Sequence, residues 1–150
     1  MEDIRGACMC GAVRFVIRGQ PLRSDYCHCS RCRKFSGSRA DPGMSVRLAD
    51  LGLEGREALT VFSCEGFSDR AFCSTCGSSL FAGRDLFRAE SLSVCMGSLD
   101  TDPGIRPALR KGVAWNAPWL PLDASLPLHE GAPPSAPEQE GDHGSAAGVP

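Results

Sequence analysis

Apolar and polar residues alternate along several short stretches of the chain. The clearest is 11–18, where Val13, Phe15 and Ile17 alternate with arginines. A period of two with β-branched and aromatic side chains predicts a β-strand with one buried face. Gly19-Gln20-Pro21 follows directly and predicts the turn that ends this strand.

Further short runs of this kind recur, separated by segments rich in glycine and proline. The predicted strands are Met44–Leu48, Leu59–Cys64, Ser79–Ala82, Ser91–Met96 and Val113–Trp119. Turns are predicted over Ala49–Glu57, and a short helical turn over Arg31–Phe35. Because no segment of useful length has the helical period, the fold class is predicted to be all-β.

The composition changes after Leu128. Residues 129–150 are rich in Pro, Gly, Ala, Ser, Glu and Gln and contain almost nothing apolar. Such a segment cannot bury enough surface to order itself. We therefore predict one folded domain over 1–128 and a disordered C-terminal tail over 129–150. A length of 150 residues is enough for one domain and too short to expect two.

The overall charge is close to neutral. The 16 basic and 18 acidic residues give a formal net charge of −2, which predicts no general attraction to nucleic acid or to an anionic membrane. The apolar runs are only a few residues long, so we predict neither a signal peptide nor a membrane-spanning helix. The chain is expected to be cytoplasmic, with no membrane partner.

Nine cysteines are the most informative feature of the composition. An odd number without a secretory signal argues against a disulfide framework. Seven of them fall in groups with metal-ligand spacing: Cys8 and Cys10; Cys27, Cys29 and Cys32; Cys73 and Cys76. Cys64 and Cys95 stand alone in strand patterns and are predicted to be core thiols. This count suggests one site of four thiols and one of three.

The group Cys27-x-Cys29-x-x-Cys32 can close on one metal ion, since a tight turn brings its side chains to a common point. Three ligands are one short of a closed structural zinc site, which leaves a position for solvent or substrate. The alternative is a closed site completed by another side chain, with His28, Cys64 and Cys95 as candidates. On extended backbone His28 points away from its two neighbours, which disfavours it as a ligand.

Four motifs occur in a specific order: Cys8-Met9-Cys10-Gly11-Ala12-Val13-Arg14-Phe15, Cys27-His28-Cys29-Ser30-Arg31-Cys32-Arg33-Lys34-Phe35-Ser36-Gly37, Arg70-Ala71-Phe72-Cys73-Ser74-Thr75-Cys76-Gly77-Ser78-Ser79-Leu80 and Gly97-Ser98-Leu99-Asp100. Together they resemble the glutathione-dependent formaldehyde-activating (GFA) enzyme family, which also includes centromere protein V. The resemblance runs from about Arg5 to Pro127. It implies a Mss4-like β-tent of short antiparallel strands organised around zinc sites.

The resemblance also implies how the cysteines are divided. A closed structural Zn²⁺ site would take Cys8, Cys10, Cys73 and Cys76. An open, catalytic Zn²⁺ site would take Cys27, Cys29 and Cys32. The folded part, 1–128, would then be a GFA-type zinc domain.

The function that the resemblance implies is that of a carbon–sulfur lyase of the S-(hydroxymethyl)glutathione synthase type. Glutathione, as co-substrate, would enter the open site and lose its thiol proton, because a metal-bound thiol is deprotonated whereas a free one has a pKa of about 8.5. The thiolate would then attack formaldehyde or a similar small electrophile. Arg31, Arg33 and Lys34, together with Arg70, could offset the negative charge and pair with the glutathione carboxylates.

One segment departs from the family pattern. Arg110 stands about where family members commonly carry a histidine, so we do not carry the family's use of this region over to this chain.

Two other functions stay open. The chain could instead be a non-catalytic zinc-binding module for a protein or, less favoured by its charge, a nucleic-acid partner. It could also be a zinc-containing protein that responds to thiol oxidation.

Overall fold

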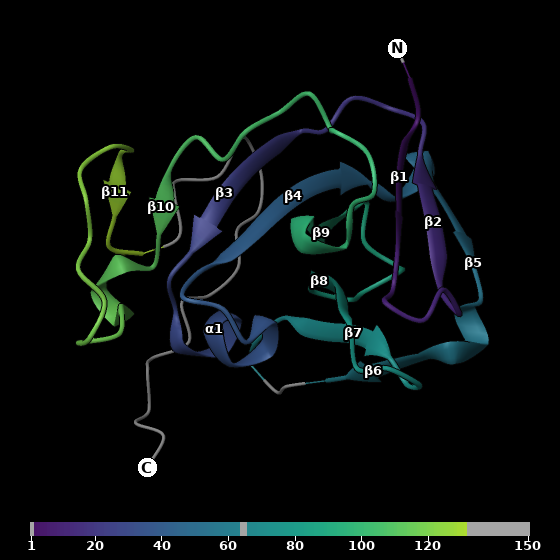
Figure 1. Ribbon diagram of the computed structural model, residues 1–150, viewed down its shortest axis with the longest axis horizontal. Helices are drawn as coiled ribbons and strands as arrows, with labels where there is room; N and C mark the ends of the chain where they lie inside the picture. Colours follow the sequence, from purple (N-terminus) through teal and green to yellow (C-terminus); the bar gives the residue numbers. More distant parts are fainter. Residues whose placement is uncertain (1, 64–65, 132–150) are drawn as a thin grey trace.

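The computed structural model describes residues 2–63 and 66–131. Its strands form two sheets, which face each other across the molecule (Figure 1). The smaller sheet is antiparallel, in the order β1-β2-β5. Its strands are β1 (Ile4–Ala7), β2 (Arg14–Ile17) and β5 (Leu51–Glu54).

The larger sheet has the order β11-β10-β3-β4-β9-β8-β7-β6. Its strands are β3 (Arg23–Cys27), β4 (Asp41–Arg47), β6 (Leu59–Phe62), β7 (Asp69–Cys73), β8 (Ser79–Gly83), β9 (Ser91–Cys95), β10 (Arg110–Lys111) and β11 (Leu128–His129). All pairs are antiparallel except those of β10, which runs parallel to both β3 and β11.

Within the described ranges, α1 (Ser30–Ser36) is the only α-helix. It begins after Cys29, whose sulfur accepts a hydrogen bond from the backbone N–H of Cys32, and ends at Gly37 in the left-handed conformation. A residue without a Cβ adopts that conformation at little cost, which ends the helix after two turns. The short helix therefore begins within the second cysteine group, after Cys29 and before Cys32.

The predicted all-β class is confirmed, and α1 confirms the predicted helical turn over Arg31–Phe35. Two local predictions were wrong. The segment 49–57, predicted as turns, contains β5, because Leu51 and Leu53 pair with Ile17 and Phe15 across the small sheet. The segment Val113–Trp119, predicted as a strand, instead begins with a 3-10 turn over Val113–Trp115.

The hydrophobic core joins the two sheets. Phe81 of β8 packs edge-to-face against Phe15 of β2 and against Phe87, with ring centroids 5.2 and 5.7 Å apart. Around this cluster are the fully or nearly fully buried side chains of Ile4, Val13, Ile17, Met44, Val46, Ala71, Leu80, Leu92 and Val94. Cys8 and Cys73 belong to the same core. Burial of each large apolar side chain contributes roughly 1.5–3 kcal/mol.

The end of the described part bears on the predicted tail. The predicted boundary after Leu128 falls within β11, so His129 is paired with Lys111. Residues 132–150 and Cys64 lie outside the described residues, so the predictions made for them stay predictions. No helix in 2–63 or 66–131 is long and apolar enough to cross a membrane.

Candidate metal centres

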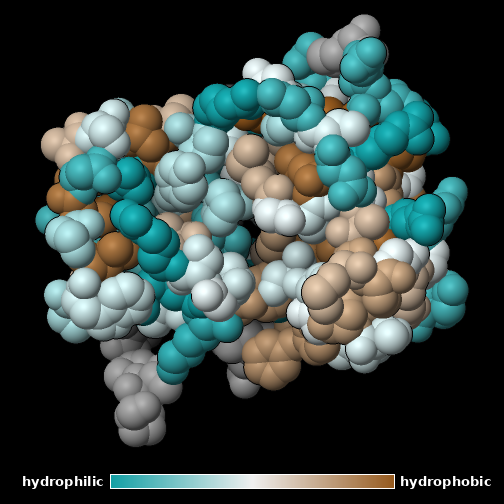
Figure 2. All heavy atoms as spheres, in the orientation of Figure 1, coloured by the Kyte–Doolittle hydropathy of each residue, from teal (hydrophilic) through white to brown (hydrophobic). Residues whose placement is uncertain are grey.

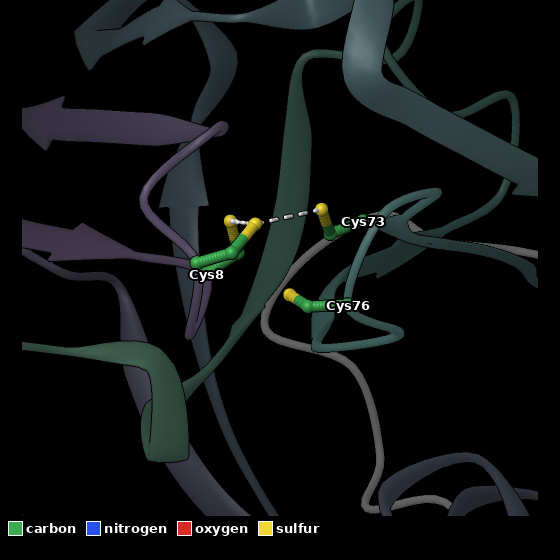
Figure 3. Close-up of side chains that lie close together, drawn as sticks. Cys8, Cys73 and Cys76 are labelled. Atoms are coloured by element: carbon green, nitrogen blue, oxygen red, sulfur yellow. Dashed lines mark hydrogen bonds between the residues drawn. The ribbon is translucent and has the colours of Figure 1, made fainter.

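The first cysteine group joins two turns that are far apart in sequence. Cys8 and Cys10 lie between β1 and β2, whereas Cys73 ends β7 and Cys76 lies between β7 and β8. Each turn contains a glycine with φ of +75°, Gly11 in one and Gly77 in the other. The side chains of Cys8, Cys73 and Cys76 point toward one another (Figure 3).

The geometry of this group fits a tetrahedral metal site. Cys10 Sγ lies 3.5 Å from Cys8 Sγ and 3.8 Å from Cys73 Sγ, and all four sulfurs lie within 4.8 Å of one another. Zn–S bonds of about 2.3 Å in a tetrahedron place sulfurs about 3.8 Å apart. The donor set therefore suits a closed zinc-type site.

Ser78 holds the two turns of this group together. Its hydroxyl accepts a hydrogen bond from the backbone N–H of Met9 at 2.9 Å, and it lies 3.2 Å from Cys76 Sγ. Hydrogen bonding from Ser78 lowers the pKa of the Cys76 thiol to about 5. A thiol held partly as thiolate is prepared to bind a cation.

The second group lies where β3 meets α1. Cys27 ends β3, Cys29 caps the helix and Cys32 lies in its first turn. Their three sulfurs lie within 4.8 Å of one another. Among the described residues, no further His, Cys, Asp or Glu donor atom joins them. A tetrahedral metal ion held by these three sulfurs would keep one position open, and this group is called the open site below.

The three thiols of this group perturb one another strongly. The pKa of Cys29 is lowered to about 2, because the side chains of Cys27 and Cys32 donate hydrogen bonds to its sulfur. The same contacts raise the pKa of Cys32, and they raise that of Cys27 to about 11. Crowded thiols in this state compete for protons, and a cation between them would replace those protons.

Arg70 of β7 is buried beside this group. One of its Nη2 hydrogens is donated to Cys32 Sγ at 3.4 Å, and Nη1 donates to the carbonyl oxygens of Ser68 and Asp69. The guanidinium also lies 5.5 Å from the ring centroid of Phe35 and 5.3 Å from that of Phe67. A permanent positive charge is thus fixed next to one of the three sulfurs.

His28 is fully buried between two of the cysteines but is not part of their donor group. Asn116 Nδ2 donates to two carbonyl oxygens, so its Oδ1 faces His28 and accepts from Nδ1 at 3.0 Å. The other ring nitrogen, Nε2, has no hydrogen-bond partner. Burial lowers the pKa of His28. The prediction that disfavoured His28 as a ligand agrees with this arrangement.

A groove of about 770 Å³ runs between the first cysteine group and the end of α1. It is lined by Cys8 and Cys76 of the first group, by the end of α1 from Lys34 onward, and by Asp41 and Cys95. Figure 2 shows this face of the molecule hollowed near its centre, near the position of β8 and β9 in Figure 1. The groove therefore gives a small molecule a place next to the cysteines.

Comparison with known proteins decides the family. Residues 3–115 match the family model described as glutathione-dependent formaldehyde-activating enzyme, which is most of the chain. The chain belongs to this GFA enzyme family. The predicted resemblance is thereby confirmed.

Two individual proteins are also similar to this chain. A Halomonas elongata protein named "Putative glutathione-dependent formaldehyde-activating enzyme" is 35% identical over 88 residues, which cover 52% of this chain and 54% of that protein. The chain thus spans about half the length of that relative. A Rhodobacter sphaeroides protein of known crystal structure is 28% identical, with a TM-score of 0.53, covering 69% of this chain and 91% of that one.

The basic residues predicted to bind glutathione lie in different surroundings. Arg31 is exposed and stacks on Phe67, 4.2 Å from the ring centroid. Arg33 donates to the carbonyl oxygens of His28 and Trp115. Lys34 is exposed and lines the groove. Their role toward a ligand stays a prediction.

The segment that departs from the GFA pattern lies directly beside the open site. Arg110 and Lys111 form β10 and pair with Tyr26 and Cys27 of β3. Arg110 contacts Asp123, with Nη2 3.0 Å from Oδ2, and stacks on the ring of Tyr26. In this chain Arg110 thus connects β10 to β3, the strand that ends at Cys27 of the second cysteine group.

Sequence reasoning missed two buried carboxylates near the open site. Asp25 contacts Lys111, with Oδ1 2.7 Å from Nζ, whereas Oδ1 of the equally buried Asp41 has no partner. Burial raises the pKa of Asp41 to about 6, although the positive charges of Arg70 and Lys111 act to lower it. No periodicity marks either residue, and only the strand register brings them to the site. Cys95, predicted as a core thiol, is buried as expected.

Proposed function

We propose that this chain is a zinc-dependent enzyme of the carbon–sulfur lyase type. It would join the thiol of glutathione to formaldehyde or a similar small electrophile at the site formed by Cys27, Cys29 and Cys32. The observation that carries the proposal is that these three sulfurs converge without a fourth donor among the described residues. Membership of the GFA family supports it.

The donor set determines the metal chemistry. A zinc ion held by Cys27, Cys29 and Cys32 would supply a Lewis acid that makes a neighbouring thiol acidic, so that the thiol reacts as its thiolate at neutral pH. The three sulfurs would hold the ion and leave one position free. Arg70 would offset the negative charge of the thiolates through its hydrogen bond to Cys32.

The reaction is an addition and needs no oxidant or reductant. The thiol gives up its proton, its sulfur forms a bond to the carbonyl carbon, and the carbonyl oxygen takes up a proton. The protein therefore has to bind the thiol, lower its pKa and bring the two reactants together, which raises the rate through proximity.

The two cysteine groups would have different tasks. The first group consists of Cys8, Cys10, Cys73 and Cys76. It joins two turns that are far apart in the chain, since Cys10 and Cys73 are separated by 63 positions. Four ligands leave no position for a substrate, so this site would be structural. Only the three-cysteine group would take part in the reaction.

The direct test is the rate of adduct formation from glutathione and formaldehyde. The zinc-loaded wild-type chain should increase this rate above the uncatalysed rate, and Cys29→Ser should abolish the increase. Cys64→Ser is the matched control, because Cys64 stands outside the seven cysteines with metal-ligand spacing. A wild-type protein that is folded and zinc-loaded but leaves the rate unchanged would contradict the proposal.

Thiol binding can be followed separately from catalysis. A Cβ at Gly112 would lie 3.4 Å from Cys29 Cβ and 3.6 Å from Trp115 Cε3, so the Trp115 ring lies close to the open site. The chain has two tryptophans, and Trp119→Phe leaves Trp115 as the single tryptophan, which can be excited apart from Tyr26. Its fluorescence should change on titration with glutathione in the zinc-loaded protein, and Cys29→Ser should remove that change.

A further inference from the structure

The buried carboxylate of Asp41 occupies an unusual position on the large sheet. Asp41 is opposite Cys27 in the register of β3 and β4, so the two side chains share one face of the sheet. Asp41 also lines the groove that passes the end of α1. Asp41 thus adjoins the open site through its pairing with Cys27 and is at the same time part of the groove wall.

The carboxylate has an unused acceptor. Asp41 is only 7% exposed, and its Oδ1 has no hydrogen-bond partner. A buried charged oxygen without a partner costs free energy, so such groups are rare away from functional sites. This cost is consistent with an acceptor that is completed by a ligand.

The neighbouring cations of the protein are directed elsewhere. Lys111 Nζ lies 2.7 Å from Asp25 Oδ1. Arg70 donates to Cys32 Sγ and to two backbone carbonyl oxygens. Both cations lie close enough to act on Asp41 electrostatically, yet neither donates a hydrogen bond to it. Asp25, on the same face of the sheet, thus has Lys111 as a partner, whereas Oδ1 of Asp41 has none.

The chemistry around Asp41 favours a positively charged donor. Cys29 and Asp25 act on Asp41 with negative charge, and Arg70 and Lys111 act on it with positive charge. The free acceptor Oδ1 requires a donor, and a carboxylate attracts an ammonium donor but repels a second carboxylate. Directly opposed residues of antiparallel strands have Cβ atoms roughly 4.5–5.5 Å apart. This short distance suits a thiol that carries its nitrogen two carbons from its sulfur.

We propose that Asp41 determines thiol specificity, by accepting a hydrogen bond from an N–H group two carbons from the substrate sulfur, most strongly from an ammonium. Aminothiols are then preferred over thiols of the same size without such a group. This inference rests on the proposed function, because it requires that thiols bind at the open site. Asp41 acts in binding and does not bond to the reacting atoms.

The test compares two thiols of similar size on the zinc-loaded Trp119→Phe protein, with Trp115 fluorescence as the readout. Cysteamine carries an ammonium two carbons from sulfur, and 1-propanethiol carries a methyl group there. Asp41→Asn should lower the preference for cysteamine by about tenfold or more, as expected for the loss of a charge-assisted hydrogen bond. The different acidities of the two thiols cancel, because only the change in their affinity ratio is used.

A matched variant and the melting temperature separate this role from a structural one. Asp100 is an exposed carboxylate on the same groove, and Asp100→Asn should leave the affinity ratio unchanged. Asp41→Asn should melt at the wild-type temperature or above it, since it removes an unpartnered buried charge. A lower melting temperature, with equal loss of affinity for both thiols, would overturn the inference.

A second measurement requires no variant of Asp41. Thiocholine has the charge and spacing of cysteamine, but its nitrogen carries three methyl groups and no N–H. The Trp119→Phe protein with Asp41 intact should bind cysteamine more tightly than thiocholine, and equal affinities would overturn the inference. If glutathione and all of these thiols fail to bind, the proposed function falls as well; if they bind without preference, only the role of Asp41 falls.

Discussion

At the scale of single residues, the two cysteine groups differ in how deeply the fold depends on them. Cys8 and Cys73 belong to the hydrophobic core, whereas the three cysteines of the open group are only partly buried. Loss of a ligand from the first group therefore affects core packing and metal together. Loss of a ligand from the second group affects the site more than the fold.

We predict that Cys29→Ser and Cys76→Ser affect the stability of the fold differently. Cys29→Ser should remove tightly bound zinc from one site of two and leave the melting temperature nearly unchanged. Cys76→Ser should unfold the protein, because the turns at Cys8 and Cys73 lose the ion that joins them. Metal analysis combined with thermal melting checks both variants. Equal destabilisation by the two changes would contradict the division into structural and open sites.

A second prediction concerns the buried positive charge. Arg70→Met keeps much of the side-chain volume but removes the hydrogen bond to Cys32. We expect the zinc affinity of the open site to fall by about tenfold or more, since a hydrogen bond to a charged group contributes about 1.5–3 kcal/mol. Competition with a zinc indicator measures this change.

Arg56→Met serves as the control for Arg70→Met. Arg56 also stacks on a phenylalanine ring, that of Phe87 at 4.9 Å, but it lines a different surface pocket from the groove. Its loss should leave both zinc affinities unchanged. The same loss of affinity in both variants would indicate a general effect of removing a stacked arginine, and the electrostatic role of Arg70 would be refuted.

At the scale of elements, sequence spacing singled out the cysteines that the structure brings together in two groups, but not the strands that bring them together. The pattern in 11–18 predicted β2, because alternation of Phe15 and Ile17 with polar residues is visible within one strand. The sequence of β3, Arg-Ser-Asp-Tyr-Cys, has no such alternation, because residues 24 and 25 are both buried. Parallel pairing of β10 with β3 depends on contacts between residues about 84 positions apart, which no local pattern encodes.

The segment after β10 gives a prediction at this scale. Gly112 has φ of +66°, and a Cβ there would lie 3.3 Å from Cys29 N and 3.4 Å from Cys29 Cβ. Gly112→Ala should therefore displace Cys29 and weaken zinc binding at the open site, in addition to the backbone cost of about 1 kcal/mol for a left-handed alanine. Zinc competition and thermal melting measure the two effects separately.

Gly104→Ala is the matched control for this prediction. Gly104 has a similar φ of +70°, but a Cβ there would meet nothing within 4 Å. Both variants should lose a similar amount of stability, and only Gly112→Ala should lose zinc affinity. Equal zinc affinity in the two variants would show that the segment after β10 does not support the open site.

At the scale of the whole molecule, the closed group connects the two sheets. Cys8 and Cys10 follow β1 of the small sheet, whereas Cys73 ends β7 of the large sheet and Cys76 lies between β7 and β8. The aromatic contact between Phe15 of β2 and Phe81 of β8 also connects the two sheets. The open group lies within the large sheet and its helix, so its metal does not join the sheets.

We therefore predict that chelation removes the two metals in separate steps. A chelator of increasing strength should first take the metal of the open site, with no change in the far-ultraviolet circular dichroism spectrum. Loss of the second metal should unfold the protein, as expected for Cys76→Ser, since a structural zinc site contributes about 10–16 kcal/mol and a typical domain is stable by only about 5–15 kcal/mol. Cys29→Ser protein should show the second step alone. If one metal left wild type only together with the other, and unfolding accompanied both, the two sheets would depend on both ions and the open site could not exchange ligands in the folded protein.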